Sequence, residues 1–227
     1  MAARRGAARA LQAALLLMIL APPAAAGTVP VQVKLPIPQK IDVTGMRRLL
    51  VAGFRASDDP QVDVDQEFIA FTRDTLRKRS SFEILNVDAP PLPEQEIEDI
   101  IRNAAYWRRV AQRYSADLIV AGTLEFERSD KSGFIQEDVI SPYTGQRLRR
   151  TRYMEREGFT MSSRLYYFKG ETGELLYEQR LSEEATFDGR GHDGLTALHQ
   201  LTDRSIPEIL GVLMPRQKTE TRYLFTE

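Results

Sequence analysis

The sequence predicts a mixed-sheet α/β sandwich, built as a single domain whose elements follow the order βαβαβ–ββαβ. Apolar runs of strand length stand at residues 47–54 and 116–126, and consecutive apolar positions are typical of strands buried on both faces. Segments with helical periodicity separate the early strands, which favours a layered α/β arrangement. A later pair of alternating segments, residues 159–168 and 174–187, predicts a hairpin and therefore a mixed sheet.

The first half of the domain is predicted as strand, helix, strand, helix, strand. After the strand at residues 47–54, Asp63 followed three residues later by Gln66 predicts the start of a helix. Residues 82–87 (FEILNV) alternate and predict the second strand. Prolines then precede a second helix that carries Trp107 near the edge of its apolar stripe. We interpret Trp107 as a packing residue in preference to a ligand platform.

The second half adds the hairpin, a helix and a last strand. The hairpin turns at KGETG, residues 169–173. A third helix is predicted from about Asp193, and Pro207 inside it must either kink it or start a second helix. Residues 218–225 (KTETRYLF) predict a final strand.

The N-terminus has the pattern of a secretory signal peptide. Basic residues precede an apolar stretch at residues 11–20, and small residues follow at 24–26. We therefore expect residues 1–26 to be removed, with an uncleaved anchor as the competing interpretation. Residues 27–46 predict a Pro-rich extended arm, and residues 47–227 the α/β domain. The expected location is periplasmic or secreted.

Composition excludes several classes of function. The chain has no cysteine, which excludes disulfides, Cys nucleophiles, thiolate metal sites and the acylated cysteine of a lipoprotein. Its 31 basic and 32 acidic residues give a formal net charge of −1, which does not favour nucleic acid as a partner.

Two clusters are weighed as metal sites. The acidic loop at residues 57–67 could offer oxygen ligands to calcium, but it lacks the spacing and central glycine of an EF-hand, so helix capping is preferred. His192, Asp193 and His199 could bind zinc, but no H-E-x-x-H occurs, and we prefer a surface His192 and a half-buried His199. We therefore predict no metal and no cofactor.

No motif for catalysis occurs in the sequence. It has no G-x-S-x-G elbow, no P-loop and no G-x-G-x-x-G. The stretch GRGHDG at residues 189–194 could place an anion at a helix N-terminus, but a flexible connection is preferred. The protein is predicted not to be an enzyme.

Three stretches carry a family resemblance. RRLLVAGFRASDD (47–59), YSADLIVAGTLEF (114–126) and YYFKGETGELLYEQ (166–179) resemble the periplasmic domain shared by the curli-secretion protein CsgG, the N-terminal domain of TolB and related penicillin-binding-protein activators. The resemblance covers roughly residues 47–225 and implies the α/β fold more than a function. It also implies lipidation and membrane-inserted hairpins for the curli type. Here there is no cysteine, and residues 128–157 have no register with an apolar band.

A charged excursion at residues 127–157 interrupts the sheet pattern. It is longer than ordinary connections, which indicates a functional or disordered segment. It holds a cluster of arginines flanked by tyrosines, residue types that are enriched at protein interfaces. The candidate partner-binding residues are Tyr143, Arg147, Arg149, Arg150, Arg152 and Tyr153. A solvated loop is the alternative.

The function predicted from the sequence is an exported, non-enzymatic adaptor domain of the bacterial cell envelope. Its partner would be another cell-envelope protein, or a second copy of this chain. One alternative is an outer-membrane secretion component of the curli type, and a second is a metal- or small-molecule-binding enzyme.

Overall fold

The structure of the protein is a computed structural model that describes residues 27–226. These residues form two units. One, residues 38–216, contains the central sheet and the four helices of the described chain. The other is a ribbon made of residues 27–37 and 217–226. The predicted signal peptide at residues 1–26 lies outside the described residues.

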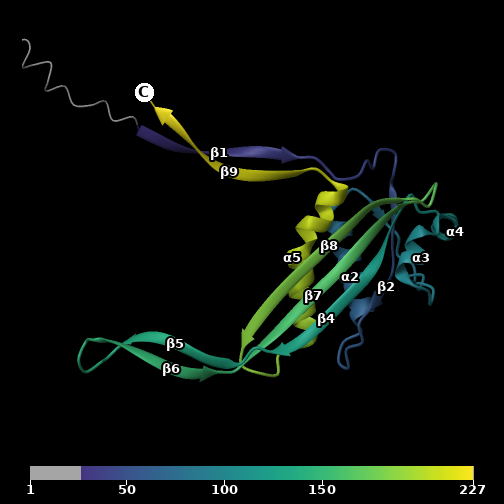
Figure 1. The fold of residues 1–227 in the computed structure, drawn as a ribbon. Helices are drawn as coiled ribbons and strands as arrows, with labels where there is room; N and C mark the ends of the chain where they lie inside the picture. The colour runs from purple at the N-terminus through teal and green to yellow at the C-terminus, as the bar shows by residue number, and fades with distance from the viewer. Residues whose placement is uncertain (1–26, 227) are drawn as a thin grey trace, which may run out of the picture. The chain divides into compact units, whose positions relative to one another are not determined.

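The larger unit is built on a five-stranded sheet with the order β3-β2-β4-β7-β8 (Figure 1). The strands are β2 (Arg48–Ala56), β3 (Glu83–Ile84), β4 (Leu118–Asp130), β7 (Arg156–Lys169) and β8 (Leu175–Asp188). β2 runs parallel to β3 and β4, whereas β4, β7 and β8 are antiparallel neighbours. The predicted mixed α/β class is therefore confirmed.

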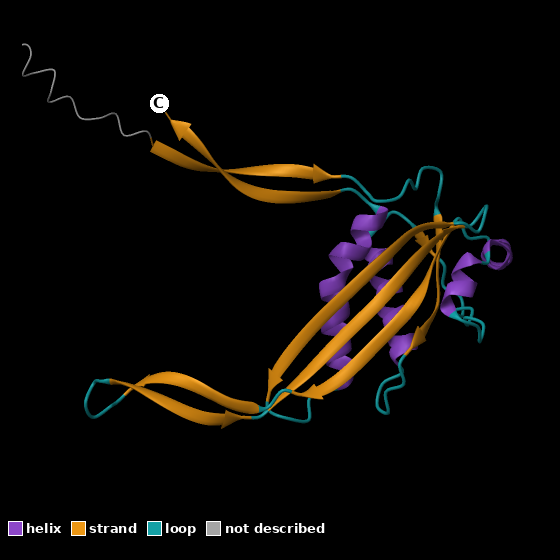
Figure 2. Cartoon of the chain, viewed as in Figure 1, coloured by secondary structure: helices purple, strands orange, loops and turns teal. Residues whose placement is uncertain are grey.

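Helices cover both faces of this sheet. α2 (Val64–Arg79) and α5 (Gly194–Leu213) pack on one face, as Figure 2 shows, and α3 (Ile97–Arg102) and α4 (Ala104–Tyr114) pack on the other. Successive side chains of β2 point to opposite faces of the sheet and pack into both layers. Leu49 and Val51 belong to one core cluster, while Leu50 and Ala52 belong to the other. The prediction that this strand is buried on both faces is confirmed.

Trp107 is the centre of the smaller core. Its side chain is 1% exposed, and its ring stacks on that of Phe168 with centroids 4.0 Å apart. The indole Nε1 donates a hydrogen bond to the carbonyl oxygen of Ile100 at 2.8 Å, so its one polar group is satisfied. The interpretation of Trp107 as a packing residue is confirmed.

Both long helices begin at aspartates. Asp63 caps α2 by accepting a hydrogen bond from the Gln66 amide, and Asp193 caps α5 by accepting from the amides of Leu195 and Thr196. These bonds satisfy donors that a helix leaves unpaired at its N-terminus. α5 then continues through Pro207 as one helix, so the alternative that a second helix starts at this proline is wrong.

Two further pairs of strands lie outside the central sheet. The chain between β4 and β7 forms an antiparallel hairpin of β5 (Gly133–Ile140) and β6 (Arg147–Met154). The Pro-rich arm forms β1 (Gly27–Ile37), which pairs with β9 (Arg216–Thr226) of the same chain. The final predicted strand thus exists but pairs with the arm. Over residues 27–226, no helix has the length and apolar character needed to cross a membrane.

Candidate functional site

The β5–β6 hairpin starts where the central sheet ends. β4 and β7 pair as far as Asp130 and Glu157, and two hydrogen bonds then lead into the hairpin. The Lys131 amide donates to the Arg156 carbonyl at 3.0 Å, and the Arg156 amide donates to Ser132 Oγ at 3.0 Å. The hairpin is therefore a direct continuation of the two central strands (Figure 1).

A cluster of ion pairs surrounds the root of the hairpin. It comprises Arg128–Glu157 (3.6 Å), Arg190–Asp130 (3.1 Å), Arg156–Asp188 (3.0 Å) and Lys131–Glu184 (3.1 Å). Several of these side chains line a cavity of about 290 Å³. Hydrogen bonds from Ser132 lower the pKa of Asp130, so this carboxylate stays charged. The cluster fixes the base from which the hairpin extends.

The register of the hairpin separates its side chains into two faces. The Tyr153 face carries Phe134, Gln136, Asp138, Ile140, Arg147, Arg149, Thr151 and Tyr153. The Leu148 face carries Ile135, Glu137, Val139, Leu148, Arg150, Arg152 and Met154. These sets follow from direct pairing, since residues opposite each other in an antiparallel pair share a face.

The structure divides the predicted partner-binding residues between these faces. Arg147, Arg149 and Tyr153 lie on the Tyr153 face, while Arg150 and Arg152 lie on the Leu148 face. Tyr143 lies between the strands and is 95% exposed. The six residues thus follow one strand and its turn, on both sides of the ribbon.

Sequence reasoning missed the exposed apolar residues of the hairpin. Phe134 is 78% exposed and contacts Tyr153 edge-on, with ring centroids 5.4 Å apart. Ile140 and Leu148 are also at least half exposed. The sequence does contain a pattern that could have revealed them. Phe134, Gln136, Asp138 and Ile140 stand at every second position, which places all four side chains on one face of a strand.

Two of the four arginines have acidic partners within the hairpin. Arg149 lies 3.7 Å from Asp138, and Arg152 lies 3.3 Å from Glu137. Across the part of the chain that the structure describes, Arg147 and Arg150 take part in no ion pair. β6 therefore carries positive charge that β5 does not neutralise.

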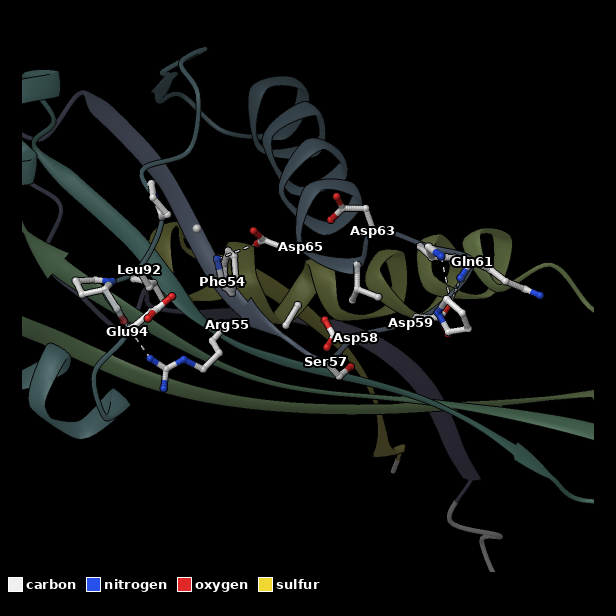
Figure 3. A pocket seen from close by; sticks show the side chains of 17 residues that line it. Phe54, Arg55, Ser57, Asp58, Asp59, Gln61, Asp63, Asp65, Leu92 and Glu94 are labelled. Atoms are coloured by element: carbon white, nitrogen blue, oxygen red, sulfur yellow. Dashed lines mark hydrogen bonds between the residues drawn. The ribbon is translucent and has the colours of Figure 1, made fainter.

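A second candidate is the cavity of about 740 Å³ beside the acidic loop (Figure 3). Three of its lining carboxylates already accept backbone hydrogen bonds. Asp59 accepts from Gln61 and Val62, Asp63 caps α2, and Asp65 accepts from the Phe54 amide at 2.8 Å. Arg55 lines the same cavity, and its Nη2 donates to the backbone carbonyls of Pro93 and Gln95. The preference for helix capping is confirmed at Asp63.

The proposed zinc residues are not brought together. His192 Nε2 lies 3.0 Å from the Asp188 carbonyl oxygen, whereas His199 stacks on Phe71 and lies 3.3 Å from a carboxylate oxygen of Glu67. Asp193 is occupied as the cap of α5. Within residues 27–226, no three His, Asp or Glu side chains are placed to hold a metal ion.

The glycine-rich stretch before α5 also offers little to an anion. Gly189 and Gly191 have φ angles of 92° and 79°, conformations that glycine adopts easily. The carboxylate of Asp193 already accepts from the first amides of the helix. That carboxylate therefore takes the place that an anion would need.

No protein-family model matches the chain, and no curated protein matches it. Several solved structures are similar. The PelC dodecamer from Paraburkholderia phytofirmans matches at 12% identity, over 82% of this chain and 100% of that one, with a TM-score of 0.37. Lipoprotein GNA1162 from Neisseria meningitidis matches at 14% identity, over 72% and 98%, with a TM-score of 0.39. The LpoB C-terminal domain from Salmonella enterica matches at 12% identity, over 74% and 90%, with a TM-score of 0.31.

Proposed function

We propose that this chain is an exported, non-enzymatic domain of the bacterial cell envelope that binds another envelope protein through the β5–β6 hairpin. The signal-peptide pattern at residues 1–26 and the CsgG/TolB-like stretches support the location. The composition of the hairpin supports its role in binding a partner protein.

The observation that carries the proposal is the exposure of aromatic and apolar side chains on the hairpin. Five large hydrophobic residues of this short element are at least half exposed: Phe134, Ile140, Tyr143, Leu148 and Tyr153. Tyrosine and arginine side chains frequently dominate binding energy at interfaces. A ribbon that is anchored by ion pairs at its root and that exposes both apolar and basic side chains is suited to contact a partner.

The curli-type alternative receives less support from the same residues. β5 and β6 have eight residues each, whereas strands that face lipid need about 9–11 with every second residue apolar. Arginines occupy both faces of β6. Insertion of either face into lipid would bury charge at a cost of about 2–4 kcal/mol for each arginine near the midplane.

The proposal is tested by photocrosslinking in a Gram-negative host that expresses the full precursor. A photoreactive amino acid replaces Tyr143, and a control places it at Leu175, which is 40% exposed on the central sheet. We expect a specific crosslink to an envelope protein from position 143 and none from position 175.

A deletion provides the second arm of this experiment. Replacing residues 133–154 with Asn-Gly keeps the pairing of β4 with β7, because that pairing ends at Asp130 and Glu157. The shortened protein should stay folded and lose its partner during affinity recovery after chemical crosslinking. Equal recovery of the same partner by the deleted and complete proteins would overturn the proposal. Cell fractionation that places the mature protein in the cytoplasm would also overturn it.

A further inference from the structure

The hairpin is an incomplete sheet. β5 and β6 pair only with each other among the described strands, so the outer edge of each strand presents unpaired backbone groups. Seven of the eight β6 residues are exposed. A two-stranded hairpin is at best marginally stable in water, and a third strand stabilises it.

The order of charges along β6 is distinctive. Residues 147–152 read basic, neutral, basic, basic, neutral, basic. Arg147 and Arg149 lie on the Tyr153 face, and Arg150 and Arg152 lie on the Leu148 face. The pattern is the same in both directions along the strand, so a complementary strand fits it whether it runs parallel or antiparallel.

The two edges of the hairpin differ in sign. β5 carries Glu137 and Asp138, whereas β6 carries four arginines and no acid. Like charges placed directly opposite each other destabilise a strand pair, and opposite charges stabilise it. The β6 edge therefore rejects the β6 edge of a second copy and favours an acidic strand.

We propose that the outer edge of β6 binds an extended acidic segment of the partner protein as a third strand, with the pattern acid–x–acid–acid–x–acid. This inference rests on the proposed function and adds the mode of binding and the chemistry of the partner. Backbone hydrogen bonds would supply affinity and the alternate side chains would supply specificity, as in other cases of strand addition. Arg147 and Arg150, which form no ion pair within the described residues, would gain acidic partners on the added strand.

A second copy of this chain is a poorer occupant than such a segment. Its own β5 offers two adjacent acids, Glu137 and Asp138, which match only the centre of the pattern. Both are already paired, with Arg152 and Arg149 respectively.

The test measures binding of a fluorescent peptide, TEVEETET, to the complete mature protein by anisotropy. The hairpin variant carries Arg147→Gln and Arg150→Gln. The matched control carries Arg108→Gln and Arg113→Gln, which remove the same charge from the exposed face of α4. We expect the control to bind like the wild type and the hairpin variant to bind roughly threefold to thirtyfold more weakly, from the usual size of exposed ion pairs.

Two peptide controls separate strand addition from simple attraction of charge. The same peptide with alternate backbone nitrogens methylated keeps its charge but cannot form the strand ladder, and TKVKKTKT reverses the charge. Neither should bind, and hydrogen exchange should show protection of β6 amides only with the acidic peptide. Absence of binding by the acidic peptide, or equal binding by either control peptide, would overturn the inference.

Self-association is measured on the same samples. If light scattering shows that the wild-type protein assembles with itself and that the hairpin variant does not, the occupant is a second copy and the inference is overturned.

If crosslinking from position 143 finds an envelope partner while the peptide fails to bind, the proposed function stands and strand addition is wrong. If position 143 gives no crosslink and the hairpin deletion leaves partner recovery unchanged, the proposed function itself is wrong.

Discussion

Asp65 joins the first turn of α2 to an irregularity in β2. The register between β2 and β4 shifts between Val51 and Phe54, and the Phe54 amide bonds to a side chain of α2. The Asp65 carboxylate accepts that amide at 2.8 Å (Figure 3). Burial raises the pKa of Asp65 above its ordinary value, although the bond from Phe54 opposes this.

This raised pKa predicts a dependence of stability on pH. The folded protein holds the Asp65 proton more tightly than the unfolded chain does, so the protonated carboxyl contributes to the stability of the fold. This contribution to stability is complete below the pKa of Asp65 in the unfolded chain and is lost as the pH rises through its pKa in the folded protein. Asp65→Asn keeps the acceptor oxygen and removes the titration. As the pH rises from about 3 to about 7, the wild type loses the Asp65 contribution to its free energy of unfolding, whereas the variant has no such contribution to lose. We therefore expect the stability of the variant to rise relative to that of the wild type over this pH range, as measured by urea denaturation.

The matched control for this measurement is Asp58→Asn, which removes an exposed carboxylate from the same cavity wall. If Asp65→Asn and the wild type show parallel pH profiles, burial of Asp65 does not influence stability as argued.

At the scale of elements, α5 depends on its N-terminal cap. Asp193 accepts from the Thr196 hydroxyl at 2.6 Å and from the Leu195 and Thr196 amides. The bonds from Thr196 lower the pKa of Asp193. The carboxylate therefore stabilises the folded state above its unfolded pKa of about 3.9, and this contribution is lost as pH falls through the folded pKa.

Asp193→Ala is expected to reduce the free energy of unfolding at pH 7, because the first amides of α5 lose their acceptor, and to reduce it less near pH 3. Urea denaturation at both pH values measures the difference. Asp203→Ala is the control on the same helix, because Asp203 makes only an exposed contact with Arg79 at 3.8 Å. Equal losses from the two variants would contradict the importance of the cap.

The two core clusters draw all their members from the larger unit, residues 38–216. Their buried residues begin at Ile41 and end at Leu213. The Lys40 and Ile41 amides also bond to the Val212 carbonyl, which ties the start of this unit to the end of α5. The β1–β9 ribbon contributes no residue to either core.

A chain of residues 38–216 is therefore expected to unfold with the free energy of the complete mature protein, to within about 1 kcal/mol, since core burial dominates stability. Fluorescence of Trp107 during urea titration reports this directly, because it is the single tryptophan and is buried. A chain of residues 48–216 is the control, and it should be less stable because it lacks Ile41. A large loss of stability in the 38–216 chain would show that the ribbon supports the fold.

The local elements were predictable because each depends on neighbours in the sequence. Apolar runs predicted β2 and β4, alternation predicted β7 and β8, and the spacing of Asp63 and Gln66 predicted the start of α2. Composition also showed that this sequence has no cysteine, and so no thiol chemistry, and the order of residues showed that arginines gather in the excursion.

Contacts that depend on folding could be known only once the chain was folded. The pairing of β1 with β9 joins two strands from opposite ends of the described chain. The hydrogen bond from the Phe54 amide to Asp65 and the separation of His192 from His199 depend on how the helices pack against the central sheet. The hairpin shows the same limit. The sequence contained its arginines, but the register decided which face each one occupies, because a shift of one residue moves every side chain of a strand to the other side. The positions of the side chains then decided which arginines meet an acid: Arg150 lies directly opposite Glu137, yet Arg152, diagonal to Glu137, forms the ion pair.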